Sequence, residues 1–424
     1  MNIIESKEDS MKTKTFKNGL VLLYEKNKEC HVDAFHINVL TGSALETGKQ
    51  LGINHLVEHL MFKSSYKRTT QQISEKLERQ GAIINAWTNY DNVCFHFCCL
   101  PEKIDKCAEI YADMLFNKNI SQSEFDKEKL VVCQEIAMYK DDYPATNETN
   151  YFDNFWNMGD VAGTTESVSG TTLKQVNNFI KRRYVPANMV ISVCSKLSFR
   201  KVCSIVEKYF GSIDNPEDYV NLRDEWKSRR VFTRQNFGKP FIQKNKATQV
   251  QVLHAFYLPK QSPVLNDLYR MVLSSGLASI LFREVREKYG LCYRIKAEDV
   301  MLLPNAFNNN QPDVLFVRSS MEKQHLKTYL EVLPEVFKRL PELLTSADLE
   351  RVVNIKKTQE TSSVDIALHN FFKYLNPEIY YLGKDLRSEE KHIFNNVEEY
   401  AKAGCEIMKN ANYDVAILGN VNKI

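Results

Sequence analysis

The sequence predicts an α+β fold that consists of two similar α/β-sandwich domains. Residues 175–214 have the pattern of a helix, an apolar strand and a second helix, and residues 396–420 that of a helix followed by an apolar strand. Each half of the chain also begins with strand-like sequence, NGLVLLYEKN in the first and ATQVQVLHAFYL in the second. This repetition indicates two copies of one fold, although a chance similarity of two α+β stretches would look the same.

The stretch between the halves, residues 215–240, is charged and has no clear period, which is typical of a linker. A chain of 424 residues is also long enough for two or three domains, each with its own core. We therefore expect a first domain over residues 1–220, a linker over residues 221–240 and a second, homologous domain over residues 241–424.

The composition excludes several classes of protein. Hydrophobic residues make up 43% of the chain and charged residues 26%, which are the values of a globular protein rather than a disordered or collagen-like one. No run of 18 or more apolar residues predicts a transmembrane helix. The formal net charge is only +3, which gives no argument for nucleic acid or an anionic membrane as a partner.

The ten cysteines are expected to be buried, reduced and chemically inert. The first residues, MNIIESKEDSMKTKTFKNG, contain no apolar run of the kind that a secretory signal needs. Thiols of a protein that is not exported remain reduced, so we expect a cytoplasmic location and no disulfides. Cys94, Cys98 and Cys99 lie close together but match no zinc-ribbon spacing.

The segment GINHLVEHLMF, residues 52–62, predicts an amphipathic helix that carries a metal site. Its apolar residues recur at helical spacing, and His55, Glu58 and His59 fall together on the opposite face. Two imidazoles one turn apart can bind one zinc ion, and the neighbouring carboxylate can accept a proton from the attacking water. The order His-x-x-Glu-His is the inverted form of the usual zinc-protease motif. The alternative is a solvated polar face that happens to contain two histidines.

A catalytic zinc normally has a third protein ligand, and residues 124–139 offer candidates. This segment predicts a helix in which Glu128 and Glu135 lie two turns apart on a partly apolar stripe. Carboxylates on such a stripe are usually paired or metal-bound. Glu135 is the candidate third ligand, and Glu128 is a candidate partner that orients one of the histidines. The alternative is an ordinary helix with surface ion pairs.

The HLVEH motif, followed by Glu135, resembles the pitrilysin family of inverted-motif zinc peptidases, which includes insulysin and the β subunit of mitochondrial processing peptidase. The resemblance covers nearly the whole chain, including EKLVVCQEI, GTTESV and RRYVPANMVISV. It implies one zinc ion per chain on His55, His59 and Glu135, with Glu58 as the general base. It also implies that the two domains form one half of a clamshell.

Two further segments resemble substrate-contacting parts of this family. LFREVREKYGLCY resembles the segment whose arginine and tyrosine contact the substrate, which assigns those roles to Arg286 and Tyr293. GAIINAWT resembles an edge strand that pairs with extended substrate, which assigns substrate binding to Asn85, Ala86 and Trp87. Taken alone, Arg286 would be a surface charge and the strand an internal one. The sequence departs from the family pattern at residues 274–276, Trp87 and Cys292.

The resemblance implies a zinc endopeptidase that hydrolyses peptides or unfolded leader segments inside a dimeric chamber. The partner is expected to be a second copy of the chain or a related peptidase subunit. The alternative is a catalytically silent structural subunit, but such subunits usually lose the zinc residues and this chain keeps all four. The choice between general peptide clearance and removal of a dedicated leader peptide stays open.

Overall fold

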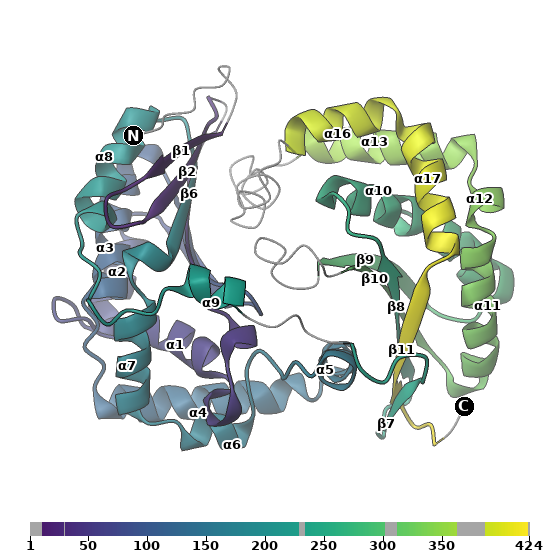
Figure 1. The fold of residues 1–424 in the computed structure, drawn as a ribbon, viewed down its shortest axis with the longest axis horizontal. Helices are drawn as coiled ribbons and strands as arrows, with labels where there is room; N and C mark the ends of the chain where they lie inside the picture. Colours follow the sequence, from purple (N-terminus) through teal and green to yellow (C-terminus); the bar gives the residue numbers. More distant parts are fainter. Residues whose placement is uncertain (1–10, 29, 229–233, 302–311, 363–385, 423–424) are drawn as a thin grey trace. The chain divides into compact units, whose positions relative to one another are not determined.

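The computed structural model describes residues 11–28, 30–228, 234–301, 312–362 and 386–422 (Figure 1). Contacts within the chain divide it into two compact units. The first contains residues up to Ala137 and resumes at Gly159, whereas the second contains Met138–Met158 and the chain beyond the linker. Each unit is built around its own sheet.

The first unit contains a six-stranded sheet in the order β1-β2-β6-β3-β5-β4. Strands β2 and β6 are parallel and all other neighbours are antiparallel. Strand β4 pairs only with β5, so it forms one edge of this sheet. The strands are β1 (Lys12–Thr15), β2 (Val21–Lys26), β3 (Asp33–Val39), β4 (Ile83–Thr88), β5 (Val93–Cys99) and β6 (Met189–Ser195).

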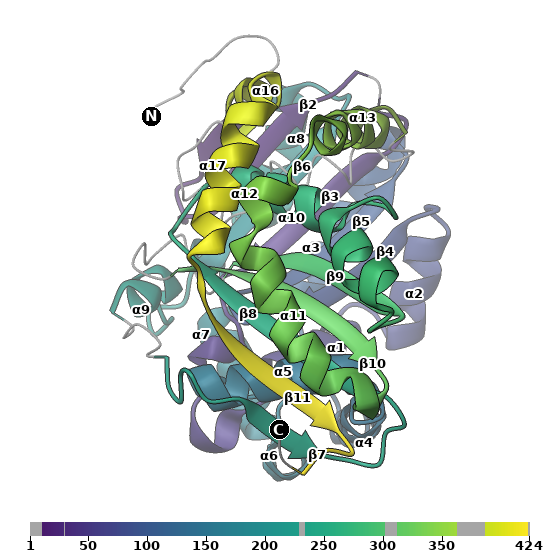
Figure 2. The same cartoon turned by 90° about the vertical axis from the view of Figure 1, so that its right-hand side faces the viewer.

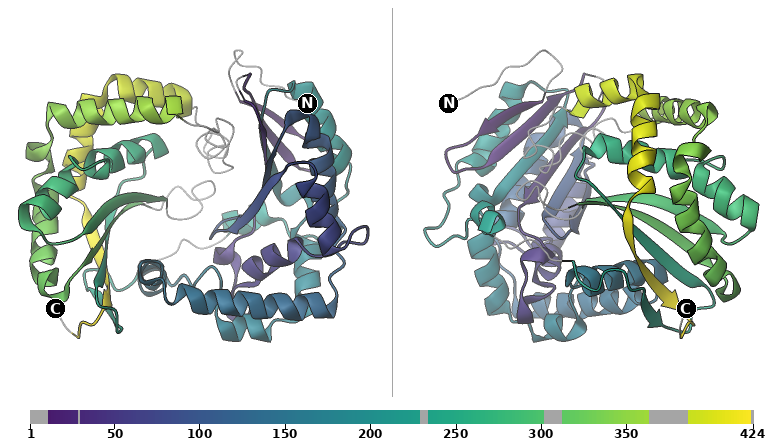
Figure 3. Two further views of the ribbon diagram at one scale, coloured as in Figure 1. Left: turned by 180° about the vertical axis from the view of Figure 1, so that it is seen from behind. Right: turned by 45° about the vertical axis from the view of Figure 1, so that its right-hand side comes forward.

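Helices cover one face of this sheet, as the views in Figures 1 and 3 show for α3 and α8. Their apolar sides join the alternate strand residues Phe35, Ile37, Phe95 and Phe97 in one buried core. The α-helices of this unit are α1 (Ile53–Met61), α2 (Thr70–Glu78), α3 (Ile104–Phe116), α4 (Gln122–Tyr139), α6 (Thr165–Gly170), α7 (Leu173–Arg183), α8 (Phe199–Val206) and α9 (Leu222–Ser228). A π-helical turn, η5 (Glu207–Gly211), continues α8.

The second unit contains a five-stranded sheet in the order β7-β11-β8-β10-β9. Its strands are β7 (Phe241–Lys244), β8 (Val250–Leu258), β9 (Arg294–Met301), β10 (Asp313–Met321) and β11 (Asn412–Gly419). Its helical elements are α5 (Tyr143–Trp156), α10 (Pro263–Ser274), the π-helix η6 (Phe282–Glu287), α11 (Leu326–Lys338), α12 (Leu340–Leu343), α13 (Ser346–Ser362), α16 (Leu386–Asn395) and α17 (Val397–Lys409).

Helices lie on both faces of this second sheet. Helix α11 runs across one face, where Phe337 stacks on Phe256 with ring centroids 3.7 Å apart (Figure 2). Helix α5 packs on the other face, where the Tyr151 ring meets Phe316 edge-on at 5.0 Å. Helix α5 therefore joins the second unit, although it precedes much of the first unit in the sequence.

The two sheets repeat one topology, which confirms the α+β fold with two similar domains. In each unit, the parallel pair (β2 with β6, β7 with β11) is followed across the sheet by three antiparallel strands. In both units the strand that follows the first long helical connection, β4 or β9, lies at the edge. No helix in the described part of the chain is long and apolar enough to span a membrane. All ten cysteines lie in described segments and are free, and nine of them are buried.

Candidate functional site

Helix α1 presents two different faces because its apolar residues fall at helical spacing. Ile53, Leu56, Val57, Leu60 and Met61 are each no more than 2% exposed and join the core. The opposite face carries the two histidines and the glutamate of the HLVEH motif. In the first unit, this helix lies beside the long helix α4, which supplies both candidate glutamates (Figure 1).

His55, His59 and Glu135 come together with their ligand atoms all within 4.8 Å of one another. Glu135 Oε2 lies 3.2 Å from His59 Nε2, and Glu135 Oε1 lies 3.7 Å from His55 Nε2. Two imidazole nitrogens and a carboxylate oxygen facing one point fit a tetrahedral zinc site with one open position. No other group of three potential metal ligands occurs among the described residues.

The two histidines have different electrostatic surroundings. Burial, together with the neighbouring His59, lowers the pKa of His55 to about 4, so its ring is neutral at pH 7, as metal binding requires. Burial works to lower the pKa of His59 as well, but the hydrogen bond with Glu128 and the charge of Glu135 raise it overall. Glu128 Oε2 lies 3.3 Å from His59 Nδ1, and Glu128 Oε1 lies 2.5 Å from Lys63 Nζ. Glu128 is thus placed to hold the His59 ring with Nε2 toward the metal position.

Glu58 lies next to this group and is held by a residue that the sequence did not reveal. Its Oε2 accepts a 2.6 Å hydrogen bond from Thr88 Oγ1, at the end of β4. Burial raises the pKa of Glu58 above its ordinary value, which brings it closer to the range where a carboxylate exchanges protons near neutral pH. The alternation along β4 places Thr88 on the same side as Ile84 and Ala86, which pack toward the helices.

The start of α1 is fixed by Glu46, a second residue whose role the sequence did not reveal. Gly52 precedes the helix with φ +82°, and a Cβ there would lie 2.3 Å from the carbonyl oxygen of Ala162. Glycine has no side chain to cap the helix, and Glu46 does so instead. Its carboxylate accepts hydrogen bonds from the backbone N–H groups of Gly52 (2.6 Å) and Asn54 (2.8 Å).

The proposed substrate strand is the edge strand β4. Asn85 is exposed, and Ala86 and Trp87 are half-buried. The Trp87 ring packs on His96 of the neighbouring strand, with centroids 5.0 Å apart, and His96 stacks on His36 at 4.8 Å. A strand with only one neighbour offers unpaired backbone groups to an extended peptide.

Arg286 and Tyr293 lie in the second unit, at the π-helix η6 and just before β9. The Arg286 guanidinium lies 5.0 Å from the centre of the Tyr293 ring and 4.3 Å from that of Phe282. Tyr293 is 78% exposed, so its hydroxyl is available to a ligand. Short π-helical segments are frequent at functional sites.

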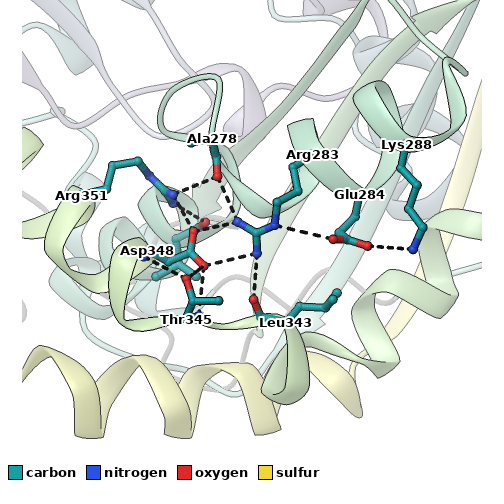
Figure 4. Close-up of polar contacts among 9 residues, drawn as sticks. Ala278, Arg283, Glu284, Lys288, Leu343, Thr345, Asp348 and Arg351 are labelled. Carbon is teal, nitrogen blue, oxygen red and sulfur yellow. Dashed lines mark hydrogen bonds and ion pairs between the residues drawn. The ribbon is translucent and has the colours of Figure 1, made fainter.

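A buried ion-pair network anchors the helix that carries Arg286 (Figure 4). Arg283 donates hydrogen bonds to Asp348 (3.1 Å) and to the backbone oxygen of Leu343 (2.8 Å). Asp348, only 1% exposed, also accepts from Arg351 (2.5 Å) and from the Thr345 hydroxyl (2.8 Å). Burial works to raise the pKa of Asp348, but the two arginines and Thr345 hold it below its ordinary value. The carboxylate is therefore charged and ties η6 to the start of α13.

Two family models match this chain in succession. The first, insulinase (peptidase family M16), matches residues 21–167, and the second, the peptidase M16 inactive domain, matches residues 171–356. Together the two matches span residues 21–167 and 171–356, which include parts of both units, and the second match begins within the first unit.

Curated relatives and solved structures agree with these matches. The chain is 26% identical over 387 residues to an uncharacterized zinc protease of Rickettsia felis, covering 89% of this chain and 87% of that protein. It is 31% identical to an uncharacterized zinc protease of Mycobacterium leprae, covering 66% and 64%. A protease from Helicobacter pylori has the same fold, with a TM-score of 0.83 at 20% identity over 97% and 99% of the two chains. The periplasmic protease PqqL of Escherichia coli matches with a TM-score of 0.72 at 17% identity, over 99% of this chain and 48% of that one.

Proposed function

Because the chain belongs to the insulinase (M16) family of peptidases, we propose that it is a zinc-dependent endopeptidase that cleaves peptides or unfolded leader segments. The observation that carries this proposal is the convergence of His55, His59 and Glu135 beside the carboxylate of Glu58. Relatives of 26% and 31% identity carry the name zinc protease. One zinc ion per chain is the stoichiometry that one such group supports.

His55, His59 and Glu135 would hold the metal, which when bound polarises a peptide carbonyl and lowers the pKa of water. Glu58 then accepts the proton of the attacking water and delivers it to the leaving amine. The Thr88 hydroxyl occupies one oxygen of Glu58, which fixes the carboxylate and leaves the other oxygen for the proton. Glu128 keeps the His59 ring oriented throughout.

The substrate roles proposed for the other residues follow from their places in the fold. The open edge of β4, at Asn85, Ala86 and Trp87, is suited to pair with an extended segment of substrate. An exposed tyrosine hydroxyl and a guanidinium, on Tyr293 and Arg286, are suited to donate hydrogen bonds to a developing oxyanion. Folded domains present no such extended segment and would be poor substrates.

We propose that the enzyme works as a dimer, either with a second copy of itself or with a related subunit. The resemblance to the pitrilysin family supports this, because it implies that the chain is one half of a clamshell; the PqqL chain, of which this chain covers 48%, is about twice as long. A reducing compartment, the cytoplasm, is proposed as its location, which agrees with ten free cysteines, of which nine are buried.

The test compares the wild-type protein with Glu58→Gln and with Glu78→Gln, an exposed glutamate of α2 in the same unit. Zinc content is measured by atomic absorption, and cleavage of unstructured peptides by mass spectrometry. Glu58→Gln should retain zinc and lose peptide cleavage by about a hundredfold or more, while Glu78→Gln should keep both. Wild-type protein that binds zinc without cleaving any peptide, alone or with a related subunit, would instead support the silent structural subunit.

A further inference from the structure

A cavity of about 280 Å³ lies entirely within the second unit. It is bounded on one side by the first turns of α5, residues 142–148, and on the other by strands β8, β9 and β10. The metal group, which consists of His55, His59 and Glu135, belongs to the first unit, so this cavity is a separate structural feature. Its volume allows one or two amino-acid side chains, and its lining is rich in charged and hydrogen-bonding groups.

Three hydrogen-bonding side chains form a row across the floor of this cavity. Ser320 on β10 is opposite Arg294 on β9 and opposite Gln251 on β8, so all three project from one face of the sheet. The Ser320 hydroxyl donates a 2.5 Å hydrogen bond to Gln251 Oε1. This bond directs the amide group of Gln251, whose NH₂ makes no hydrogen bond to any described residue.

The neighbouring row contains charges that neutralise one another. Arg318 Nη2 lies 2.6 Å from Glu148 on α5, and Arg318 Nε lies 2.7 Å from Glu298. Lys296 Nζ also contacts Glu298, at 2.6 Å. Within the described part of the chain, Arg294 has no ion pair or hydrogen-bonded partner, and its side chain is exposed. Arg294 is therefore a basic group of the cavity without an ion pair to any described residue, next to a free amide donor. The lining also contains Asp142, whose carboxylate accepts a hydrogen bond from the backbone N–H of Ala145 (3.2 Å) at the start of α5.

This arrangement selects for a carboxylate rather than a phosphate. A carboxylate has a single charge and accepts from a guanidinium in bidentate fashion. A phosphate group has a charge of about −1.5 to −2 at pH 7, which the single charge of Arg294 would not balance, and the carboxylate of Asp142 lines the same cavity. Arg294 follows directly after Tyr293, the residue proposed to contact the peptide, so the peptide itself is the nearest source of a carboxylate.

We propose that this cavity binds a carboxylate group of the peptide substrate, with Arg294 as the group that binds it and Gln251 as a second donor. The carboxylate belongs either to an acidic side chain or to the C-terminus of the peptide. The inference rests on the proposed peptidase function and deepens it, because it assigns a preference for acidic peptides to a region outside the metal group.

The test uses the full-length Glu58→Gln protein, because this variant is expected to bind peptides without cleaving them. Equilibrium binding of fluorescent peptides to it is measured by fluorescence anisotropy. In one peptide series, every C-terminus is amidated and each peptide carries a single glutamate at a different position. A neutral peptide has glutamine instead, and a third peptide has glutamine and a free C-terminal carboxylate. We expect one acidic form to bind about tenfold more tightly than the neutral peptide, as for a charge-assisted hydrogen bond. The preferred form identifies whether the side chain or the terminus is bound.

Three variants, each made in the Glu58→Gln protein, decide whether Arg294 causes the preference for acidic peptides. Arg294→Gln should abolish the preference for acid, and Arg294→Glu should reverse it in favour of a peptide with lysine at the same position. Arg339→Gln is the matched control, since Arg339 is an exposed arginine of the same unit that pairs only weakly with Glu342, at 3.7 Å. It should leave the preference unchanged.

Several results would overturn the inference: equal binding of acidic and neutral peptides, no binding of any peptide, or a preference that survives Arg294→Gln. Uniformly weaker binding of all peptides by both Arg294 variants would indicate a structural role and would also reject it. The proposed peptidase function fails separately, if the wild-type protein cleaves no peptide while the Arg294-dependent preference persists. Cleavage of peptides without any such preference would leave the peptidase function standing and remove only the carboxylate site.

Discussion

The residues of the metal group obtain their properties from the side chains around them. His59 lies between two carboxylates, Glu128 at Nδ1 and Glu135 at Nε2. His55 differs, because its buried Nδ1 has no hydrogen-bond partner among the described residues. The orientation of one ligand is thus set by a polar contact and that of the other by packing. The two histidines are therefore expected to respond differently to changes around them.

Glu128→Gln should weaken zinc binding about tenfold or more, because the amide is a weaker acceptor for the His59 ring and removes a negative charge beside it. Zinc affinity is measured by competition with a chromophoric chelator. Asp126→Asn, an exposed residue of the same helix, is the control and should leave the affinity unchanged. Equal affinities in all three proteins would show that Glu128 does not orient the histidine.

The sequence predicts the local part of this site and not its partners from elsewhere in the chain. His55, Glu58 and His59 lie on one helix, so helical spacing alone brings them together. Glu135 could be proposed from its partly apolar stripe, and the family resemblance strengthened that prediction. Thr88 and Glu46 had no such signal, because their contacts depend on where a strand end and a loop pack against the helix. Such contacts are not encoded in any periodicity.

At the scale of elements, α1 depends on a buried carboxylate for its first turn. Burial raises the pKa of Glu46 to about 7, although hydrogen bonds from Asn54 and Gly52 work to lower it. In the unfolded chain the pKa returns to its ordinary value of 4.5. Between these values the folded protein binds more protons than the unfolded one, so the free energy of unfolding falls as pH rises through this range. Below pH 4.5 the contribution is fully present, and above about 7 it is lost.

Glu46→Gln should flatten this dependence, because the amide does not titrate. We expect the stability of wild-type protein to decline between about pH 4.5 and 7 relative to that of the variant. The measurement is urea unfolding of metal-free protein at several pH values, so that proton release on zinc binding does not contribute. Glu75→Gln, whose partner Arg79 is 4.0 Å away at the surface, should keep the wild-type slope. Identical slopes for wild type and Glu46→Gln would contradict the raised pKa.

The π-helix η6 depends in a similar way on the carboxylate of Asp348. Asp348→Asn should destabilise the second unit by about 2 kcal/mol, since two arginines lose a buried charged partner while Arg283 keeps some access to water. Peptide cleavage should fall as well, because the same helix carries Arg286. Denaturant unfolding and cleavage assays measure the two effects. Glu342→Gln, at an exposed pair, should change stability by less than about 0.5 kcal/mol; an equal loss in both variants would reject the anchoring role.

Strand order is the part of the fold that the sequence could not supply. Alternating hydrophobicity indicated the strands, but it does not say which one lies at an edge. The structure places β4 and β9 at the edges, in equivalent positions of the two repeats. Helix α5 was equally hard to assign, because its membership in the second unit depends on contacts such as Tyr151 with Tyr257, far apart in the sequence (2.8 Å between hydroxyl oxygens). The edge position of β4 is what makes pairing with a peptide feasible.

At the scale of the whole molecule, the groups proposed to act in catalysis are divided between the two units. The first unit contains the metal group and Glu58, whereas the second contains Arg286, Tyr293 and the proposed carboxylate site. The two units thus repeat one fold but differ in their proposed roles, with metal binding in one and substrate contacts in the other. In the dimer proposed from the family resemblance, the second unit of one subunit would supply substrate contacts to the metal group of its partner.

This division predicts complementation between two inactive variants of a homodimer. Glu58→Gln lacks the base and Tyr293→Phe lacks the hydroxyl that would donate to the oxyanion, so each alone should lose about a hundredfold or more of its activity. After mixing and subunit exchange, one site of each mixed dimer would combine Glu58 of one chain with Tyr293 of the other. Peptide cleavage should therefore recover to a substantial fraction of the wild-type rate. A site built within one chain cannot recover in this way, because every chain in the mixture carries a lesion. Exchange is followed independently by energy transfer between labelled subunits, and its occurrence without recovery of cleavage would reject the shared site.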